Sequence, residues 1–170
     1  MSLSIHEAVV PVLVRALQSL TAVLEKGRLH AESEKIEPSV LLGARLYPDM
    51  FPFSRQVQVV SDNCKGLVSR LAAVEPPKYA DTETTFAELK ERLEKTVKYV
   101  QSFQPGQFEG ADKRVVELKF PNATLSFKSG WDYLFAFALP NMYFHSATAY
   151  DILRHSGVKL TKPDFLGKIN

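Results

Sequence analysis

The chain has 170 residues, of which 45% are hydrophobic and 24% are charged, so it is long enough to bury one sizeable core and short for two. The 21 Lys and Arg residues nearly balance the 19 Asp and Glu residues, which leaves a formal net charge of +2 and no block of like charge. This argues against a protein that binds nucleic acid through its electrostatic field. One cysteine cannot form an internal disulfide, and the N-terminus lacks the basic-then-apolar pattern of a secretory signal. We therefore expect a single domain in the reducing cytoplasm.

The first predicted element is an amphipathic helix over residues 4–25, where apolar side chains recur every three or four positions. Ser4 and Glu7 have capping-box spacing at its start, so their side chains can satisfy backbone donors of the first turn. Gly27 is expected to end this helix. Residues 28–53 alternate short apolar runs with prolines. We expect a long irregular connection there, with one or two short helical turns, that covers one end of the core.

Two more amphipathic helices are predicted over residues 54–74 and 84–103, and each is followed by a proline-containing stop. Each has one apolar stripe and is expected to bury that face. In the second of them, Glu88 and Arg92 lie four residues apart. This spacing predicts a supporting ion pair on the solvent side of the helix.

The period of the pattern then changes, because apolar and polar residues alternate on both sides of a possible turn within residues 116–127. This alternation predicts a β-hairpin. A last helix is predicted over residues 131–155, and residues 133–150 contain no charged side chain. Several polar residues in its middle would be costly in lipid, which favours a buried central helix over a membrane span. An irregular tail follows and is expected to lie across the bundle.

These elements together predict one all-α domain over residues 1–170. It is a four-helix bundle with a long connection after helix 1 and a small β-hairpin before helix 4. In such bundles, sites are built from polar side chains that point inward from facing helices.

The sharpest local feature is the pair Asn141 and His145 on the last predicted helix. Because they are four residues apart, they lie on one face, one turn from each other. Pro140 removes one backbone hydrogen bond and is expected to bend the helix just before the pair, which is a common way to open a pocket. Two interpretations stay open. The residues are a functional pair, with Tyr143 as a further binding candidate, or they are core side chains that satisfy each other or a tyrosine hydroxyl.

On the second predicted helix, Gln56 sits beside the apolar stripe at the end nearest the long connection, so its amide can reach inward. Asn63 lies on the opposite shoulder of that stripe and is the weaker candidate. The alternative role for Gln56 is structural. As a boundary residue, its amide would tether the connection by hydrogen bonds.

The long connection carries Arg45 and Asp49 between prolines. Residues that precede proline are held extended, so this segment is expected to be fairly rigid. The two side chains can line the mouth of a pocket, or they can form a local ion pair that fixes the loop.

The remaining histidines and the cysteine are predicted to be structural. His6, His30 and His155 have no partner at metal-ligand spacing, and Cys64 lies on an apolar stripe, which predicts a buried, inert thiol. The sequence contains no cysteine pair, HExxH motif, glycine-rich phosphate loop or GxSxG motif.

Several strings of residues resemble one branch of the DinB/YfiT-like superfamily, a branch that is catalogued as a domain of unknown function. The strings are Arg45-Leu46-x-Pro48-Asp49-Met50, Arg55-Gln56-Val57-Gln58 with Asp62, Leu139-Pro140-Asn141-x-Tyr143-Phe144-His145 with Thr148-Ala149-Tyr150, and Leu153-Arg154-His155. The resemblance covers nearly the whole chain. It implies a four-helix bundle with a long link after the first helix, often dimeric, with a cavity between helices at one end.

Members of the wider superfamily typically bind a divalent metal through three histidines, one on the second helix and two at i, i+4 on the last. Several are thiol-cofactor-dependent transferases or isomerases. Carried onto this chain, the resemblance places these three positions at Gln56, Asn141 and His145. Two amide oxygens and one imidazole suit zinc poorly. We expect at most a weakly bound, harder divalent ion at His145, with help from Asp49.

The sequence thus predicts a small-molecule pocket at one end of the bundle, with the metal site altered or lost. There His145 acts as acid, base or vestigial metal ligand. The alternative is a non-catalytic homodimer whose polar core residues fix helix register. Neither nucleic acid nor a membrane is an expected partner. The residues expected to contribute to ligand binding are Gln56, Asn141, Asp49, Arg45 and Tyr143.

Overall fold

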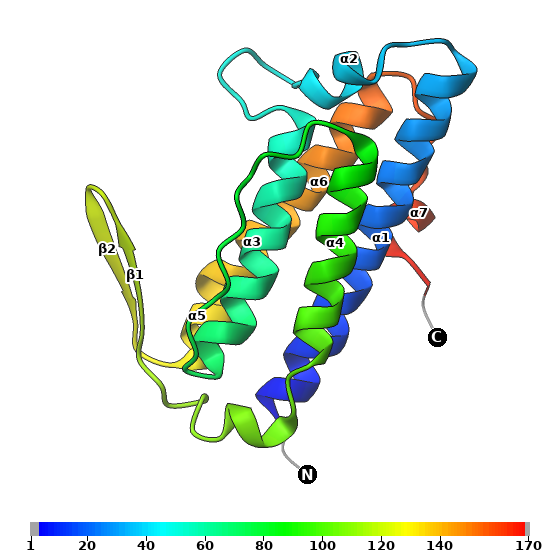
Figure 1. Ribbon diagram of the computed structural model, residues 1–170. Helices are drawn as coiled ribbons and strands as arrows, with labels where there is room; N and C mark the ends of the chain where they lie inside the picture. Colours follow the sequence, from blue (N-terminus) through cyan, green and yellow to red (C-terminus); the bar gives the residue numbers. More distant parts are fainter. Residues whose placement is uncertain (1–3, 169–170) are drawn as a thin grey trace.

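The computed structural model describes residues 4–168 and confirms the predicted helical fold. Long helical segments run up and down beside one another, and a two-stranded antiparallel hairpin stands alongside helix α3 (Phe53–Leu71) (Figure 1). Polar side chains gather on two faces of this helix, where it meets its two neighbouring helices.

Helix α1 (Ile5–Ser33) begins with the predicted capping box, in which Ser4 and Glu7 bond to each other's backbone N–H. The prediction that Gly27 ends this helix was wrong, because the glycine lies inside it and serves helix packing. A Cβ at this position would lie 2.8 Å from a methyl carbon of Leu153. Close contact with helix α6 (Leu139–His155) therefore offsets the roughly 1 kcal/mol that glycine costs in a helix interior.

The predicted long connection is consequently shorter and contains one short helix, α2 (Pro38–Gly43). Helix α3 (Phe53–Leu71) and helix α4 (Phe86–Gln101) follow. The predicted solvent-side pair of Glu88 and Arg92 was wrong. Glu88 accepts hydrogen bonds from the backbone at the start of α4, where Thr85 is the N-cap, and Arg92 is only 3% exposed.

The hairpin lies where the alternating pattern predicts it. After a short 3-10 turn, η1 (Pro105–Phe108), strand β1 (Val116–Phe120) pairs antiparallel with β2 (Ala123–Phe127). Val116 lies opposite Phe127, and two residues form the turn.

The last predicted helix is one continuous helical segment with a change of hydrogen-bond pattern inside it. It consists of α5 (Gly130–Tyr133), a π-helical turn labelled η2 (Leu134–Ala138) and α6 (Leu139–His155). In the π-helical turn the backbone N–H of Leu139 bonds to the carbonyl of Leu134, five residues back. The π-helical turn therefore lies just before Pro140, where the sequence predicted a bend. After α6, the tail forms α7 (Lys162–Leu166) where an irregular segment was predicted.

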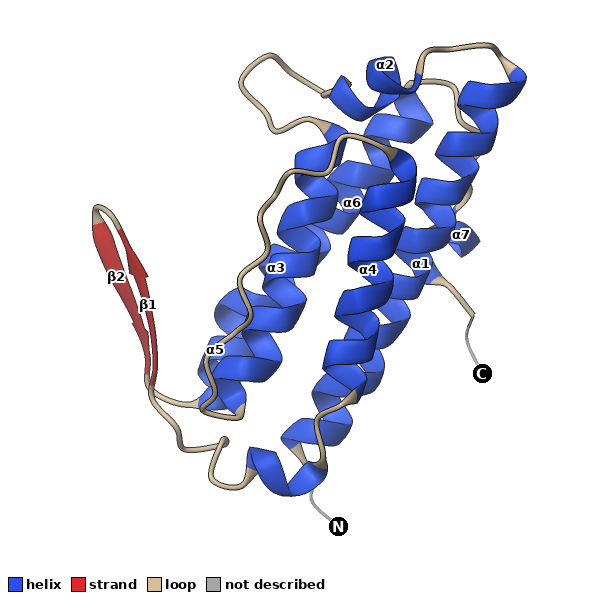
Figure 2. Cartoon of the chain, viewed as in Figure 1, coloured by secondary structure: helices blue, strands red, loops and turns tan. Residues whose placement is uncertain are grey.

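The helices pack in the order α1, α4, α3, α6 around a shared apolar core (Figure 2). Contacts between α1 and α6 are fewer, and α7 lies along α1 beside that junction. An ion pair of 2.6 Å between Lys26 and Asp164 holds α7 in place. The largest fully buried side chains include Tyr133, Phe53, Leu13, Leu67, Met142 and Ile152.

Helix α1 is the one helix among residues 4–168 whose length and mean hydropathy would allow a membrane span. Of its most apolar stretch, 44% is buried inside the bundle. Its apolar stripe packs against the other helices of the bundle.

Candidate functional site

One face of α3 carries polar side chains at every seventh residue, and each meets a polar partner on the last helical segment. The spacing of seven residues places these side chains one above another on the same face. We call this set the α3–α6 seam. It consists of three pairs, Gln56 with His145, Asn63 with Asn141, and Arg70 with Tyr133.

The first pair fixes the tautomer of the neutral imidazole. The Gln56 amide nitrogen donates to the backbone carbonyl of Phe51 over 3.1 Å, and its amide oxygen lies 2.6 Å from His145 Nδ1. Because a carbonyl can only accept, the amide orientation is set, and Nδ1 must donate its proton to Gln56. His145 Nε2 then carries the lone pair, and no hydrogen bond from residues 4–168 reaches it.

The surroundings of His145 favour its neutral form. Burial penalises the charged imidazolium, and the positive charge of Arg55 adds to this, so the pKa of His145 lies below its ordinary value. Phe51 stacks on the imidazole at a centroid distance of 6.5 Å, and Phe144 meets it edge-on at 5.1 Å. Because the imidazole is neutral at neutral pH, its unprotonated nitrogen can accept a hydrogen bond.

The second pair leaves one donor unused. Asn141 Nδ2 donates to Asn63 Oδ1 over 2.8 Å. Asn63 Nδ2 is buried and has no hydrogen-bond partner among residues 4–168, and it is the one buried side-chain polar atom there in this condition. An orphaned buried donor of this kind calls for an explanation.

In the third pair, Arg70 donates to the Tyr133 hydroxyl over 3.3 Å. Its side chain folds back along α3, and its guanidinium lies so close to Gly66 that a Cβ at this position would clash with it. The guanidinium therefore lies over Gly66, one turn nearer to Asn63 than its own Cα.

A cleft of about 320 Å³ opens beside the seam, which is within the usual size of small-molecule sites. Strand β1 forms one wall, and α3 with the last helical segment forms the other. His145 lies one turn beyond Asn141 and outside this lining. The lining residues are Arg55, Val59, Asp62, Asn63, Arg70, Glu117, Leu118, Lys119, Phe120, Phe137 and Asn141.

Only part of the predicted set comes together. Gln56 and His145 are in direct contact, and Gln56 also tethers the connection through the Phe51 carbonyl, which is the contact that its structural role requires. Asn141 bonds to Asn63 and not to the other two predicted residues.

The other three predicted binding residues lie elsewhere. Arg45 and Asp49 are exposed, and Arg45 bonds to the carbonyl of Pro48 in its own loop. Within residues 4–168 no hydrogen bond or ion pair joins them to the seam, nor to each other. Tyr143 points to the opposite side of α6, where it lines a groove against α1. Helical spacing explains this, because Tyr143 lies two residues from both Asn141 and His145 and so faces away.

A divalent metal fits these residues poorly. The Nδ1 atom of His145 and the oxygen of Gln56 are already bonded to each other, and Asn141 is paired with Asn63. Residues 4–168 contain no group of three or more His, Cys, Asp or Glu side chains arranged to hold a metal. One imidazole nitrogen with amide neighbours falls short of the three protein ligands that catalytic zinc sites use.

The sequence did not single out Asn63 and Arg70 as site residues, although a signal was present. Gln56, Asn63 and Arg70 repeat at the heptad spacing that marks one helix face. Considered alone, Asn63 is a polar residue at the edge of the apolar stripe. Only the repeat of three polar residues marks a second, polar face.

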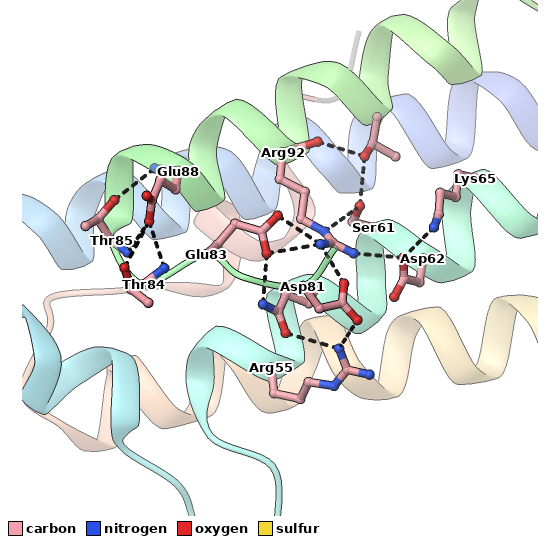
Figure 3. A network of polar contacts seen from close by, with 12 residues as sticks. Arg55, Ser61, Asp62, Lys65, Asp81, Glu83, Thr84, Thr85, Glu88 and Arg92 are labelled. Atoms are coloured by element: carbon pink, nitrogen blue, oxygen red, sulfur yellow. Dashed lines mark hydrogen bonds and ion pairs between the residues drawn. The ribbon is translucent and has the colours of Figure 1, made fainter. Parts of the chain in front are cut away.

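The opposite face of α3 carries a charged cluster that the sequence also did not reveal (Figure 3). The Arg92 guanidinium on α4 bonds to Ser61 (3.1 Å), Asp62 (2.8 Å), Asp81 (2.7 Å) and Glu83 (2.9 Å). We call these five residues the Arg92 cluster. Two of its carboxylates come from the extended segment between α3 and α4, so the cluster fastens that segment to both helices.

Further charges surround the Arg92 cluster. Arg55 pairs with Asp81 over 2.6 Å, and Lys65 pairs with Asp62 over 2.7 Å. Tyr79 lies under the cationic groups of Lys65, Arg92 and Lys95, at 4.3–5.0 Å from its ring centroid. Arg55 also lines the cleft and packs on Phe51, so it links the two faces of α3.

The predicted inert cysteine is where the sequence places it. Cys64 is fully buried, and burial raises the pKa of its thiol far above the ordinary value.

Comparisons with known proteins identify relatives of this fold. A family model described as "Domain of unknown function (DUF1993)" matches residues 5–166. The chain is similar to the crystal structure of a DinB family member protein from Shewanella denitrificans, with 36% sequence identity, coverage of 96% of this chain and 92% of that chain, and a TM-score of 0.87. A search of curated proteins found no match. The predicted resemblance is therefore confirmed, and the chain belongs to the DUF1993 family, with the fold of a DinB family member.

Proposed function

We propose that this chain binds a small organic molecule along the α3–α6 seam without a resident metal, with neutral His145 as the acceptor at the end of the site. The observation that carries the proposal is the hydrogen-bond relay from the Phe51 carbonyl through Gln56 to His145 Nδ1. It leaves an unprotonated Nε2 one helical turn from Asn141, which lines a cleft of ligand size.

Each residue of the relay has a distinct part. Phe51 orients the Gln56 amide, Gln56 selects the tautomer, and Nε2 of His145 accepts a hydrogen bond or a proton from the O–H or N–H of a ligand. Gln56 can remain bonded to Nδ1 when Nε2 gains a proton, so the imidazole keeps its orientation during proton uptake. The lowered pKa keeps the free site in the accepting form.

The test is a fragment screen by ¹H–¹⁵N NMR on protein stripped of metal with a chelator. We expect compounds that shift seam resonances in the wild type and in His155→Ala, and lose this effect in His145→Ala. His155 is the matched control because it is an exposed histidine on the same helix. Melting curves establish that each variant is folded.

Metal content separates this proposal from the metal-dependent alternative. We expect purified, untagged protein to contain far less than one equivalent of divalent metal by inductively coupled plasma mass spectrometry. Near-stoichiometric metal that disappears in His145→Ala contradicts the proposal, as does ligand binding that returns only when a divalent ion is added.

The second candidate is a structural role, favoured because Gln56 satisfies both Phe51 and His145. In that case the seam fixes helix register in a non-catalytic protein, which the sequence predicts to be a homodimer. His145→Ala then lowers the free energy of unfolding by about 1–3 kcal/mol, and the screen yields no compound that depends on His145. Sedimentation velocity measures whether the chain is a dimer.

A further inference from the structure

The cleft beside the α3–α6 seam is lined by a residue with an unused hydrogen-bond donor. Asn63 Nδ2 is buried without a partner among residues 4–168, and Asn63 is one of the residues that line the cleft. Asn63 Oδ1 is already occupied by Asn141. The atom left to meet a ligand is therefore a donor, and leaving such a donor unmet is costly.

A guanidinium lies close to this donor. Arg70 folds back over Gly66, and Gly66 is three residues from Asn63, which is about 4.5 Å along the helix axis. The Arg70 side chain donates to one neutral hydroxyl and forms no ion pair within residues 4–168. Most of its donors thus remain available, and a guanidinium suits the two oxygens of a carboxylate.

The charges around the cleft favour an anion. Asp62 is neutralised by Arg92 and Lys65, and Arg55 is paired with Asp81. The unpaired charged side chains in the lining are Arg70, Lys119 and Glu117, so positive charge exceeds negative charge by one.

The other wall of the cleft is apolar in part. Leu118 and Phe120 come from β1, with Val59 from α3 and Phe137 from the π-helical turn. Phe120 is 49% exposed, so it keeps apolar surface that a ligand can cover. An apolar body placed here would bury this surface.

We propose that the cleft takes a small carboxylate with an apolar body, whose acid group bonds to Asn63 Nδ2 and the Arg70 guanidinium while its body packs on the hairpin. This inference rests on the proposed function, because it names the ligand class of the same seam. A hydroxyl or amine on such a molecule would lie toward His145.

The test compares three probes that share one body, namely 3-phenylpropionate, 3-phenylpropionamide and 3-phenylpropylamine, titrated into the full chain by ¹H–¹⁵N NMR. We expect the carboxylate to bind most tightly and to shift the Asn63 side-chain amide. The affinity of the amide should be lower by a factor of about ten or more. The amine should not shift the resonances of the residues that line the cleft.

Two variants make the test specific. Asn63→Asp keeps the oxygen that accepts from Asn141 and replaces the donor with a second oxygen, so the preference should reverse toward the amine. Gln18→Glu adds the same charge at an exposed position on α1 and should leave the preference unchanged. Gly66→Ala removes no charge but displaces the Arg70 guanidinium, so it should weaken carboxylate binding about ten-fold.

The outcomes separate the two proposals. Equal binding of the three probes in the cleft, or carboxylate binding that survives Asn63→Asp, overturns the ligand class and leaves small-molecule binding at the seam intact. A cleft that responds to none of the probes also overturns the class. The proposed function fails separately, through a fragment screen that yields no compound dependent on His145.

Discussion

The two polar faces of α3 differ in how completely their polar atoms are paired. Toward α4, every side of the Arg92 guanidinium meets a partner, because Ser61, Asp62, Asp81 and Glu83 surround it. Toward α6, Asn63 and Arg70 have one partner each, and Asn63 Nδ2 has none among residues 4–168. A saturated network holds a fold in one arrangement, whereas an incomplete one has capacity left for a ligand.

The largest expected effect comes from breaking the saturated face. Arg92→Met leaves three carboxylates without their shared cation, and removal of one partner of a buried charge network typically costs about 3–5 kcal/mol. Urea denaturation measures this loss. The control is Arg28→Met, which removes exposed pairs with Glu25 and Glu32 and should cost less than about 1 kcal/mol. Similar losses in the two variants would contradict the contrast between a buried cluster and a surface pair.

Substitutions on the α6 side of α3 should lower the free energy of unfolding less than Arg92→Met does. Replacing both partners of a hydrogen bond there should cost less than replacing one. Asn141→Leu leaves the Asn63 oxygen without its donor, for a cost of about 1–3 kcal/mol. The double variant Asn63→Leu with Asn141→Leu removes both partners and should be nearly neutral or stabilising. A double-mutant cycle by urea denaturation checks this, and additive losses at the two sites would rule out the idea that the orphaned partner causes the cost.

Gly66→Ala should separate stability from ligand binding, because it should maintain or raise the free energy of unfolding while it disturbs the Arg70 guanidinium in the cleft. Alanine is favoured over glycine in a helix by up to about 1 kcal/mol, so the free energy of unfolding should change little or rise. Yet the added Cβ displaces Arg70 from its place over the helix. Thermal melts together with the arginine side-chain NMR signals test this, and an unchanged Arg70 environment would contradict it.

The smallest effect expected is a pH dependence assigned to His145. Its folded-state pKa is lowered, first by burial and then by Arg55, so the unfolded chain binds a proton more readily. Stability from this group is therefore present above the unfolded pKa of about 6.5 and is lost as pH falls through the folded-state pKa. Urea midpoints between pH 7 and 5 should decline in the wild type and decline less in His145→Ala, with His155→Ala as the control.

On the α4 side of α3, the group whose protonation should make stability depend on acidic pH is Asp81. Burial alone would raise the pKa of Asp81, but hydrogen bonds and charges from Arg55 and Arg92 outweigh it and lower the pKa. Its contribution to stability is present above a pH of about 4 and is lost as pH falls through the folded-state pKa. Asp81→Asn should flatten this acid limb without changing the slope near neutral pH.

The sequence predicts the fold because helix periodicity and strand alternation are local signals. It fails where a residue serves a distant partner. Gly27 is a helix breaker in isolation and a packing position against Leu153 in the fold. Arg92 has the spacing of a surface pair with Glu88, but its partners come from a segment without a regular pattern.

Only part of the candidate site is predictable from the sequence, because several of its residues depend on partners that are distant in the chain. Gln56 and His145 each lie beside an apolar stripe, which marks them as inward polar residues, and their side chains are in contact. The partner of Asn141 depends on which α3 turn lies opposite, and that is set by helix packing and not by any local pattern. Arg45, Asp49 and Tyr143 are polar and near the others in sequence, which does not place them on the seam.

The π-helical turn resolves a mismatch of register between the two helical segments of the seam. Asn63 and Arg70 are seven residues apart on α3, while their partners Asn141 and Tyr133 are eight apart. Eight residues of regular α-helix would rotate the two partners about 80° away from each other around the axis. The wider turn at Leu134–Ala138 absorbs the surplus residue. Deletion of one residue there would therefore conserve both pairings and straighten the helix, whereas the same deletion between Asn141 and His145 would turn the imidazole away from Gln56.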